Sequence, residues 1–316
     1  MAALFAGFAA SGLIGFAQQT IGNLSVRSQV GPVNHLITGF VVGGVTGAPI
    51  VIRGIGPSLA QFGVVNPLKK PVLTLYNSRS EVIAQNIGWS TRPVSELASI
   101  KSAHGAFGLA DNSDDCGFSL TLDPGLYTVQ LSEMSGASGI GLLELYNGNG
   151  FGNVAQSSPH LINISGLCTV ASGEAVAIAG MVLPVNRRIL IRAIGPALGQ
   201  FGVVGALANP KFDIVFPEYL VPVIGPATIL PARVVASNDD WNDQLPFNRD
   251  VSVPWSGSSD EIRAATLRCR AFPLPEGSKD AAMLVAINHY PMTVQVSAAD
   301  GVGGVALIEI YDVEGL

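Results

Sequence analysis

Hydrophobic and polar residues alternate along several short segments of this chain, which is the pattern of half-buried β-strands. Over residues 126–132 an apolar residue stands at every second position, with a hydroxyl or amide residue between. The preceding Asp123-Pro124-Gly125 predicts a turn, because Pro fixes φ and Gly tolerates positive φ. Residues 71–76 and 142–146 also predict strands, since they are short, rich in β-branched or aromatic residues and bounded by turn residues.

Helical periodicity is weak throughout the chain. It favours only short helices near residues 94–104 and 260–270, and single turns after Gly56-Pro57 and Gly195-Pro196. The number of predicted strands therefore far exceeds the number of predicted helices, which indicates an all-β protein.

The chain also repeats itself, and this decides the predicted fold. Residues 52–65, IRGIGPSLAQFGVV, return as IRAIGPALGQFGVV at residues 191–204, an offset of 139. Four more blocks recur in the same order, and the offset grows to 165 through insertions near 217–231 and 242–260. The matched blocks are 23–25 with 163–165, 82–89 with 234–241, 127–132 with 292–297, and 142–146 with 307–311.

This duplication predicts two tandem homologous antiparallel β-sandwich domains, jelly-roll-like, with seven to nine short strands in each. We place an apolar N-terminal segment at residues 1–21 and the first sandwich at 22–147. A linker follows at 148–161, where NGNGFG is typical of a loop, and the second sandwich covers 162–316.

Four blocks of the sequence resemble a known kind of module. They are residues 52–59, the SNDDW run at 237–241, FPLPEGSKD at 272–280, and residues 305–311. Such blocks occur in a β-sandwich repeat module that recurs in tandem in large secreted or surface proteins of environmental bacteria, similar in style to bacterial pre-peptidase C-terminal domains. The resemblance covers about 22–147 and 162–313, and the first copy departs from it with NIGW at 86–89 and DNSDD at 111–115. It implies an extracellular, non-catalytic role and supplies no catalytic residues.

Charged residues are scarce, at 13% of the 316 residues, against an average near 25%. The first 68 residues contain only two charges, Arg27 and Arg53, and none lies between Glu144 and Glu174. The net charge of −6 and the absence of a basic run exclude nucleic acid as a partner. Because soluble monomers normally keep a charged surface, so much uncharged chain predicts contact with another molecule.

Residues 1–17, MAALFAGFAASGLIGFA, are nearly all apolar and shorter than the roughly 20 residues of a membrane-spanning helix. One interpretation is a signal peptide that is removed, with Gly15-Phe16-Ala17 as an imperfect cleavage site. The other is a segment that is kept and packs on a neighbouring copy, as in donor-strand complementation. In the second case the subunit interface contains Leu4, Phe5, Phe8, Leu13, Ile14 and Phe16.

Arg53 and Arg192 occupy equivalent positions within apolar segments, and so do Glu144 and Glu309. A charge between Ile and Leu residues is seldom buried without a partner. We therefore predict two structural ion pairs, Arg53–Glu144 and Arg192–Glu309.

Two acidic loops are candidate calcium sites, with Asp111 and Asp115 in the first and Asp239 and Asp240 in the second. Their oxygen-bearing residues recur at alternate positions, as calcium-binding loops require. The alternative is an ordinary turn in which Asp and Asn side chains bond nearby backbone. We expect no other cofactor.

The three cysteines form no metal-binding pattern. Either all are buried thiols, or Cys168 and Cys269 form a disulfide within the second half.

No nucleophile–base pair, HExxH motif or set of paired carboxylates stands out, so we expect neither an enzyme nor a small-molecule substrate. The leading hypothesis is a secreted structural protein of the extracellular cell surface, whose copies assemble through the N-terminal segment into a filament, tube or surface layer. The alternative is an adhesin or a pair of carbohydrate-binding modules, with Trp89, Trp241 and the acidic loops binding a glycan, with or without calcium.

Overall fold

The computed structural model shows a chain built mostly of antiparallel β-strands, which confirms the predicted all-β class. The structure describes residues 17–19, 21–103, 105–148, 153–155, 160–171, 176–182, 187–221, 228–243, 247–248, 257–287 and 291–314. Within these ranges, no helix has both the length and the apolar character that crossing a membrane requires.

Repeat 1 consists of two antiparallel sheets that pack face to face. The first sheet has the order β2 (Asn23–Val30), β9 (Gly139–Asn147), β4 (Ala48–Ile55), β7 (Cys116–Leu122). The second has the order β3 (Leu36–Gly43), β8 (Gly125–Glu133), β5 (Pro71–Tyr76), β6 (Val82–Asn86). Counted within the repeat, these are strands 1-8-3-6 and 2-7-4-5, the double Greek-key arrangement of a jelly roll.

Repeat 2 has the same strand order. Its first sheet is β11 (His160–Val170), β21 (Gly304–Asp312), β13 (Arg187–Ile194), β19 (Ala281–Ile287). Its second sheet is β12 (Ala177–Val182), β20 (Pro291–Ala298), β14 (Pro210–Phe216), β17 (Arg233–Asn238), with β18 (Phe247–Asn248) added at the end. Within these two sheets, β18 is the described strand that has no counterpart in repeat 1.

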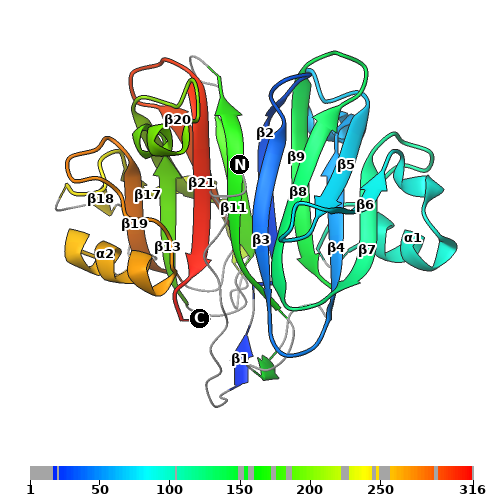
Figure 1. Ribbon diagram of the computed structural model, residues 1–316, viewed down its shortest axis with the longest axis horizontal. Helices are drawn as coiled ribbons and strands as arrows, with labels where there is room; N and C mark the ends of the chain where they lie inside the picture. The colour runs from blue at the N-terminus through cyan, green and yellow to red at the C-terminus, as the bar shows by residue number, and fades with distance from the viewer. Residues whose placement is uncertain are drawn as a thin grey trace.

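The two repeats lie side by side and are joined by their edge strands (Figure 1). Strand β2 pairs antiparallel with β12, and β11 pairs antiparallel with β3. Since β11 is the twin of β2 and β12 the twin of β3, each repeat contributes the same two edges to the junction. A single hydrophobic core runs through both repeats, with Val26 and Leu36 from one and Ala179 and Met181 from the other.

Two strands near this junction were not predicted. The expected linker contains β10 (Asn153–Ala155), which pairs with β1 (Ala17–Gln19), and β11 begins two residues before the predicted boundary.

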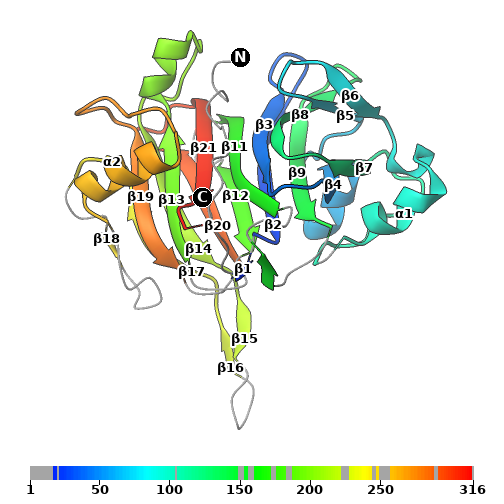
Figure 2. The same ribbon diagram turned by 60° about the horizontal axis from the view of Figure 1, so that its bottom comes forward.

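In repeat 2, β15 (Tyr219–Val221) and β16 (Thr228–Leu230) form a separate hairpin, which projects from the body in Figure 2. This hairpin corresponds to the first predicted insertion.

Four of the five described helices lie close to where the sequence predicts them, and the short helix over residues 89–91 was not predicted. The five are α1 (Val94–Lys101), α2 (Ser259–Arg268) and the 3-10 helices η2 (Pro57–Phe62), η3 (Trp89–Thr91) and η4 (Pro196–Phe201). Ser258 caps α2 in a capping box with Glu261. Helices η2 and η4 begin after Gly56 and Gly195, where a Cβ atom would lie 2.3 and 2.0 Å from a leucine carbonyl oxygen. Glycine is therefore required at the centre of the repeated motif.

Candidate functional site

The ion pairs predicted from the duplication are present in both repeats. Arg53 on β4 lies directly opposite Glu144 on β9, and its Nε is 3.0 Å from Glu144 Oε2. In repeat 2, Arg192 Nε is 3.2 Å from Oε2 of its cross-strand partner Glu309. All four residues are buried.

A tyrosine completes each pair, two residues after the glutamate on the same strand. The Tyr146 hydroxyl donates to Glu144 Oε1 at 2.9 Å, and the Tyr311 hydroxyl donates to Glu309 Oε1 at 2.8 Å. Burial raises the pKa of both tyrosines well above its ordinary value, so the hydroxyls keep their protons and remain donors. Burial also raises the pKa of Glu144, and the charge of Arg53 opposes this shift.

Each guanidinium also packs against a phenylalanine from the loop that covers it. The Arg53 guanidinium carbon is 4.7 Å from the Phe107 ring centroid, and the Arg192 carbon is 4.7 Å from that of Phe272. These clusters are closed to solvent, and their charges are paired internally. The two ion pairs that the sequence predicts are therefore present, and the partner of each buried charge is the one predicted.

Asp115, a candidate calcium ligand, instead forms hydrogen bonds with the backbone of the repeated glycine–proline motif. The Asp115 carboxylate accepts hydrogen bonds from Gly56 N at 2.8 Å, Ser58 N at 3.3 Å, Ser113 Oγ at 2.7 Å, and Ser58 Oγ. It is fully buried. Its carboxylate therefore holds the start of η2, where the orphan N–H groups of a helix need an acceptor.

The same hydrogen bonds from the helix start to an aspartate occur in repeat 2, where Asp280 accepts from Gly195 N at 2.8 Å and Ala197 N at 3.3 Å. Sequence reasoning missed this role. The available signal was that Asp115 and Asp280 each directly precede the strand that pairs with the arginine strand.

The other candidate calcium ligands do not converge either. Asp111 Oδ1 is 2.6 Å from Lys101 Nζ, and Asp240 Oδ2 is 2.6 Å from Lys279 Nζ. Asp239 is exposed. Nowhere in the described ranges do three or more His, Cys, Asp or Glu side chains come together as a metal would require.

Trp89 and Trp241 are core residues. Trp89 is 3% and Trp241 is 2% exposed, and their indole N–H groups donate to Ala110 O and Pro275 O, both at 3.2 Å. The hypothesis that they stack against sugar rings is therefore wrong, because neither ring face is available.

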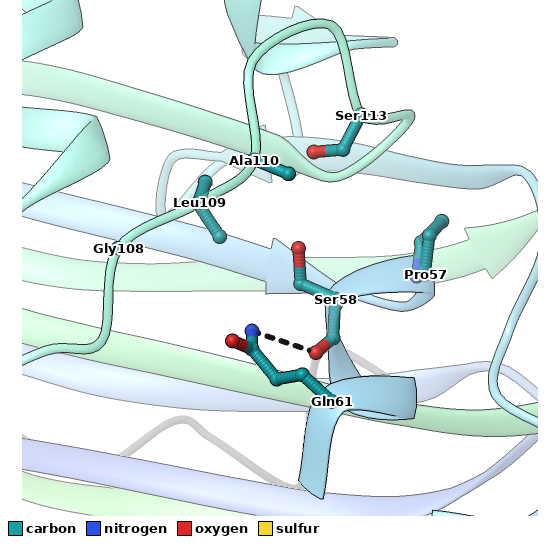
Figure 3. A pocket seen from close by; sticks show the side chains of 7 residues that line it. All are labelled: Pro57, Ser58, Gln61, Gly108, Leu109, Ala110 and Ser113. Atoms are coloured by element: carbon teal, nitrogen blue, oxygen red, sulfur yellow. Dashed lines mark hydrogen bonds between the residues drawn. The ribbon is translucent and has the colours of Figure 1, made fainter.

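A surface pocket of about 440 Å³ opens next to the serines that donate to Asp115 (Figure 3). It lies between η2 and the loop over residues 105–113, and its lining residues are Pro57, Ser58, Gln61, Gly108, Leu109, Ala110 and Ser113. Gln61 Nε2 is held by Ser58 O at 2.9 Å. The loop that lines the other side of the pocket follows Phe107, whose backbone oxygen accepts a hydrogen bond from Arg53 Nη1 at 2.8 Å.

The residues that line this pocket are polar or apolar, and none of them is charged. Both serine hydroxyls donate to the buried Asp115 carboxylate, which also accepts from the backbone N–H groups of Gly56 and Ser58. Repeat 2 has Ala197 in place of Ser58, so the hydroxyl is not part of the shared fold.

The predicted Cys168–Cys269 disulfide is absent, because Cys116, Cys168 and Cys269 are all buried free thiols. Cys168 lies on β11, where its thiol contacts Ala306 O at 3.4 Å, and Cys269 follows α2. The alternative interpretation, three small buried apolar side chains, is the correct one.

The six predicted interface residues between Leu4 and Phe16 lie outside the described residues. Compared with models of protein families and with curated proteins, the chain matches none. The resemblance to tandem modules of secreted bacterial proteins thus stays a prediction.

Proposed function

We propose that this chain is a non-enzymatic, secreted structural protein whose copies assemble through the N-terminal segment into an extracellular filament, tube or surface layer. The observation that carries this proposal is the junction between the two repeats. There, one sandwich joins a homologous sandwich by antiparallel pairing of edge strands, β2 with β12 and β11 with β3.

This junction supports assembly because an open edge strand presents unpaired N–H and C=O groups to any other strand. The chain already uses that property twice within itself. Among the described strands, β6 at the outer side of repeat 1 pairs on one side only, so the same mode of association is available to that edge.

The use of the polar residues supports a non-enzymatic role. The buried charges that recur in both repeats, Arg53 with Glu144 and Arg192 with Glu309, are paired with each other, and Asp115 and Asp280 bind backbone. We do not carry forward the carbohydrate-binding alternative, since Trp89 and Trp241, its proposed sugar platforms, are buried.

The test compares the full chain with a variant that lacks residues 1–16, a deletion that removes none of the described strands. We expect the full chain to sediment as large assemblies that electron microscopy resolves as filaments or sheets. The shortened variant should sediment as a monomer with an unchanged melting temperature. Assembly that is equal with and without residues 1–16, or a full chain that stays monomeric at every concentration, would contradict the proposal.

A further inference from the structure

Strand β6 is an open edge on the outer side of repeat 1. It pairs with β5 on one side, and no strand of the described chain pairs with it on the other. Val82 and Ile83 on this strand are 58% and 45% exposed, and Ile87 just after it is 44% exposed. Residues 82–91 include no charge and no proline. Exposed edge strands in natural proteins normally carry charged residues or proline, which prevent the addition of another strand.

The twin of this edge in repeat 2 is occupied. Strand β17 pairs on its outer side with β18, through Ala236↔Asn248 and Ser237↔Phe247. The matched blocks 82–89 and 234–241 make Ala84 and Gln85 the counterparts of Ala236 and Ser237. Strand β18 comes from the second insertion, which repeat 1 lacks. The same sandwich edge is thus covered by an antiparallel strand in one repeat and open in the other.

We propose that β6 accepts the N-terminal segment (residues 1–16) of a second copy as an added antiparallel strand opposite Ala84 and Gln85. This inference rests on the proposed function and names the acceptor of its contact. The segment is suited to the role because residues 1–20 include neither a charge nor a proline, and it leads directly into strand β1. The β15–β16 hairpin is a poorer donor, because Pro217, Pro222, Pro226 and Pro231 flank its three-residue strands.

The position of donor and acceptor determines the kind of assembly. In Figure 1, β1 lies below the junction of the repeats, whereas β6 lies within the outer half of repeat 1. The two patches are different surfaces of the chain, so the contact is heterologous. A heterologous contact that does not close into a ring generates an open filament.

The experiment uses the full chain and two variants. Val82→Lys with Ile83→Lys places two charges on the β6 edge, at exposed side chains that the fold does not need. Val65→Lys with Val204→Lys adds the same charge at positions that are 85% and 91% exposed and lie on no strand, and it serves as the matched control. Thermal melts confirm that each variant is folded.

We expect the full chain and the control to assemble, and the β6 variant to sediment as a monomer. Mixing the β6 variant, which keeps its donor, with the chain lacking residues 1–16, which keeps its acceptor, should give a 1:1 complex that grows no further. If the β6 variant assembles like the full chain while the deletion does not, the acceptor is another surface, and the proposed function stands without this inference.

A full chain that stays monomeric removes the proposed function, and hydrogen exchange then decides the fate of the edge. Amide protection at Ala84 and Gln85 that depends on residues 1–16 would show that the segment covers β6 of its own chain, which overturns the role of a second copy. Equal exchange with and without the segment would show that β6 accepts no strand from it.

Discussion

The two repeats share their main buried polar clusters and differ at an outer sheet edge and at several individual positions. Both contain the arginine–glutamate–tyrosine cluster, the aspartate that holds a 3-10 helix, and the buried tryptophan. They differ at β6, which is open where β17 is covered, and at Ser58, which is Ala197 in repeat 2. The shared features all lie within the jelly roll, and the open β6 edge is the difference on which the proposed assembly depends.

Even the shared cluster is not equally supported in the two repeats. Arg53 Nη1 donates to Phe107 O at 2.8 Å. Arg192 is just as buried, but its Nη1 and Nη2 have no acceptor among the described residues. Arg192 therefore depends more heavily on Glu309 than Arg53 depends on Glu144.

The largest predicted effect follows from this difference. Glu309→Gln leaves a buried guanidinium unneutralised and should lower the free energy of unfolding by about 3–5 kcal/mol. Glu144→Gln should cost about 1 kcal/mol less, because Arg53 keeps its bond to Phe107 O. Urea denaturation of both variants measures the difference.

Replacing the whole pair provides the control for that prediction. Arg192→Met with Glu309→Leu and Tyr311→Phe removes both charges together with the hydroxyl that donates to Glu309, and should be close to neutral, within about 1 kcal/mol. Equal losses for the two glutamine variants would show that Phe107 O contributes nothing to Arg53.

A smaller effect is expected where the repeats exchange a hydroxyl. Ser58→Ala gives repeat 1 the residue of repeat 2 and removes a hydrogen bond to the Asp115 carboxylate, at a cost of about 2 kcal/mol. The reverse change, Ala197→Ser, offers Asp280 one more donor and should not lower stability. Denaturation curves of the two variants test both directions, and a neutral Ser58→Ala would mean that the remaining donors to Asp115 suffice.

The buried ion pairs could be predicted from the sequence because the duplication shows the same charged residues twice, at equivalent positions. Arg53 and Glu144 were paired correctly since a charge in an apolar strand needs a partner, and their twins recur with it. Asp115 was harder to interpret. A loop rich in Asp and Asn looks the same in sequence whether its oxygens face a cation or the backbone of a distant helix.

The junction between the repeats could not be predicted from local pattern. Alternation shows which face of a strand is buried, but it does not show which neighbour lies beside the strand. The pairing of β2 with β12 depends on which edges remain open after both sandwiches have formed. For the same reason, the local pattern predicts a loop where the structure has strand β10.

Acid should distinguish the repeats through Glu133, whose counterpart in repeat 2 is Ala298. Burial opposes ionisation of Glu133, but hydrogen bonds from Ser135, Lys70 and Lys69 outweigh it and hold the pKa below its usual value. A lowered pKa in the folded state stabilises the fold above the unfolded value near 4.3, and this stability is lost as pH falls through the folded pKa.

We therefore expect Glu133→Gln to lower stability at pH 7 and to flatten the loss of stability below about pH 4. Denaturation midpoints measured from pH 2 to 7 test this. The control is Glu81→Gln, because Glu81 lies on an exposed turn of the same repeat. A steeper acid loss in the Glu133 variant would contradict the assignment.

The smallest effect concerns the cysteines, none of which is shared between the repeats. Burial raises the pKa of Cys116, Cys168 and Cys269 to about 12, so at pH 8 each is a protonated thiol shielded from solvent. The folded protein should therefore react negligibly with a thiol-specific dye, whereas the unfolded protein should titrate three groups. A reductant should leave the melting temperature unchanged, because no bridge is present to break. Rapid labelling of one thiol in the folded state would show that its part of the sandwich opens locally, and the repeat that opens would be the less stable half of the comparison.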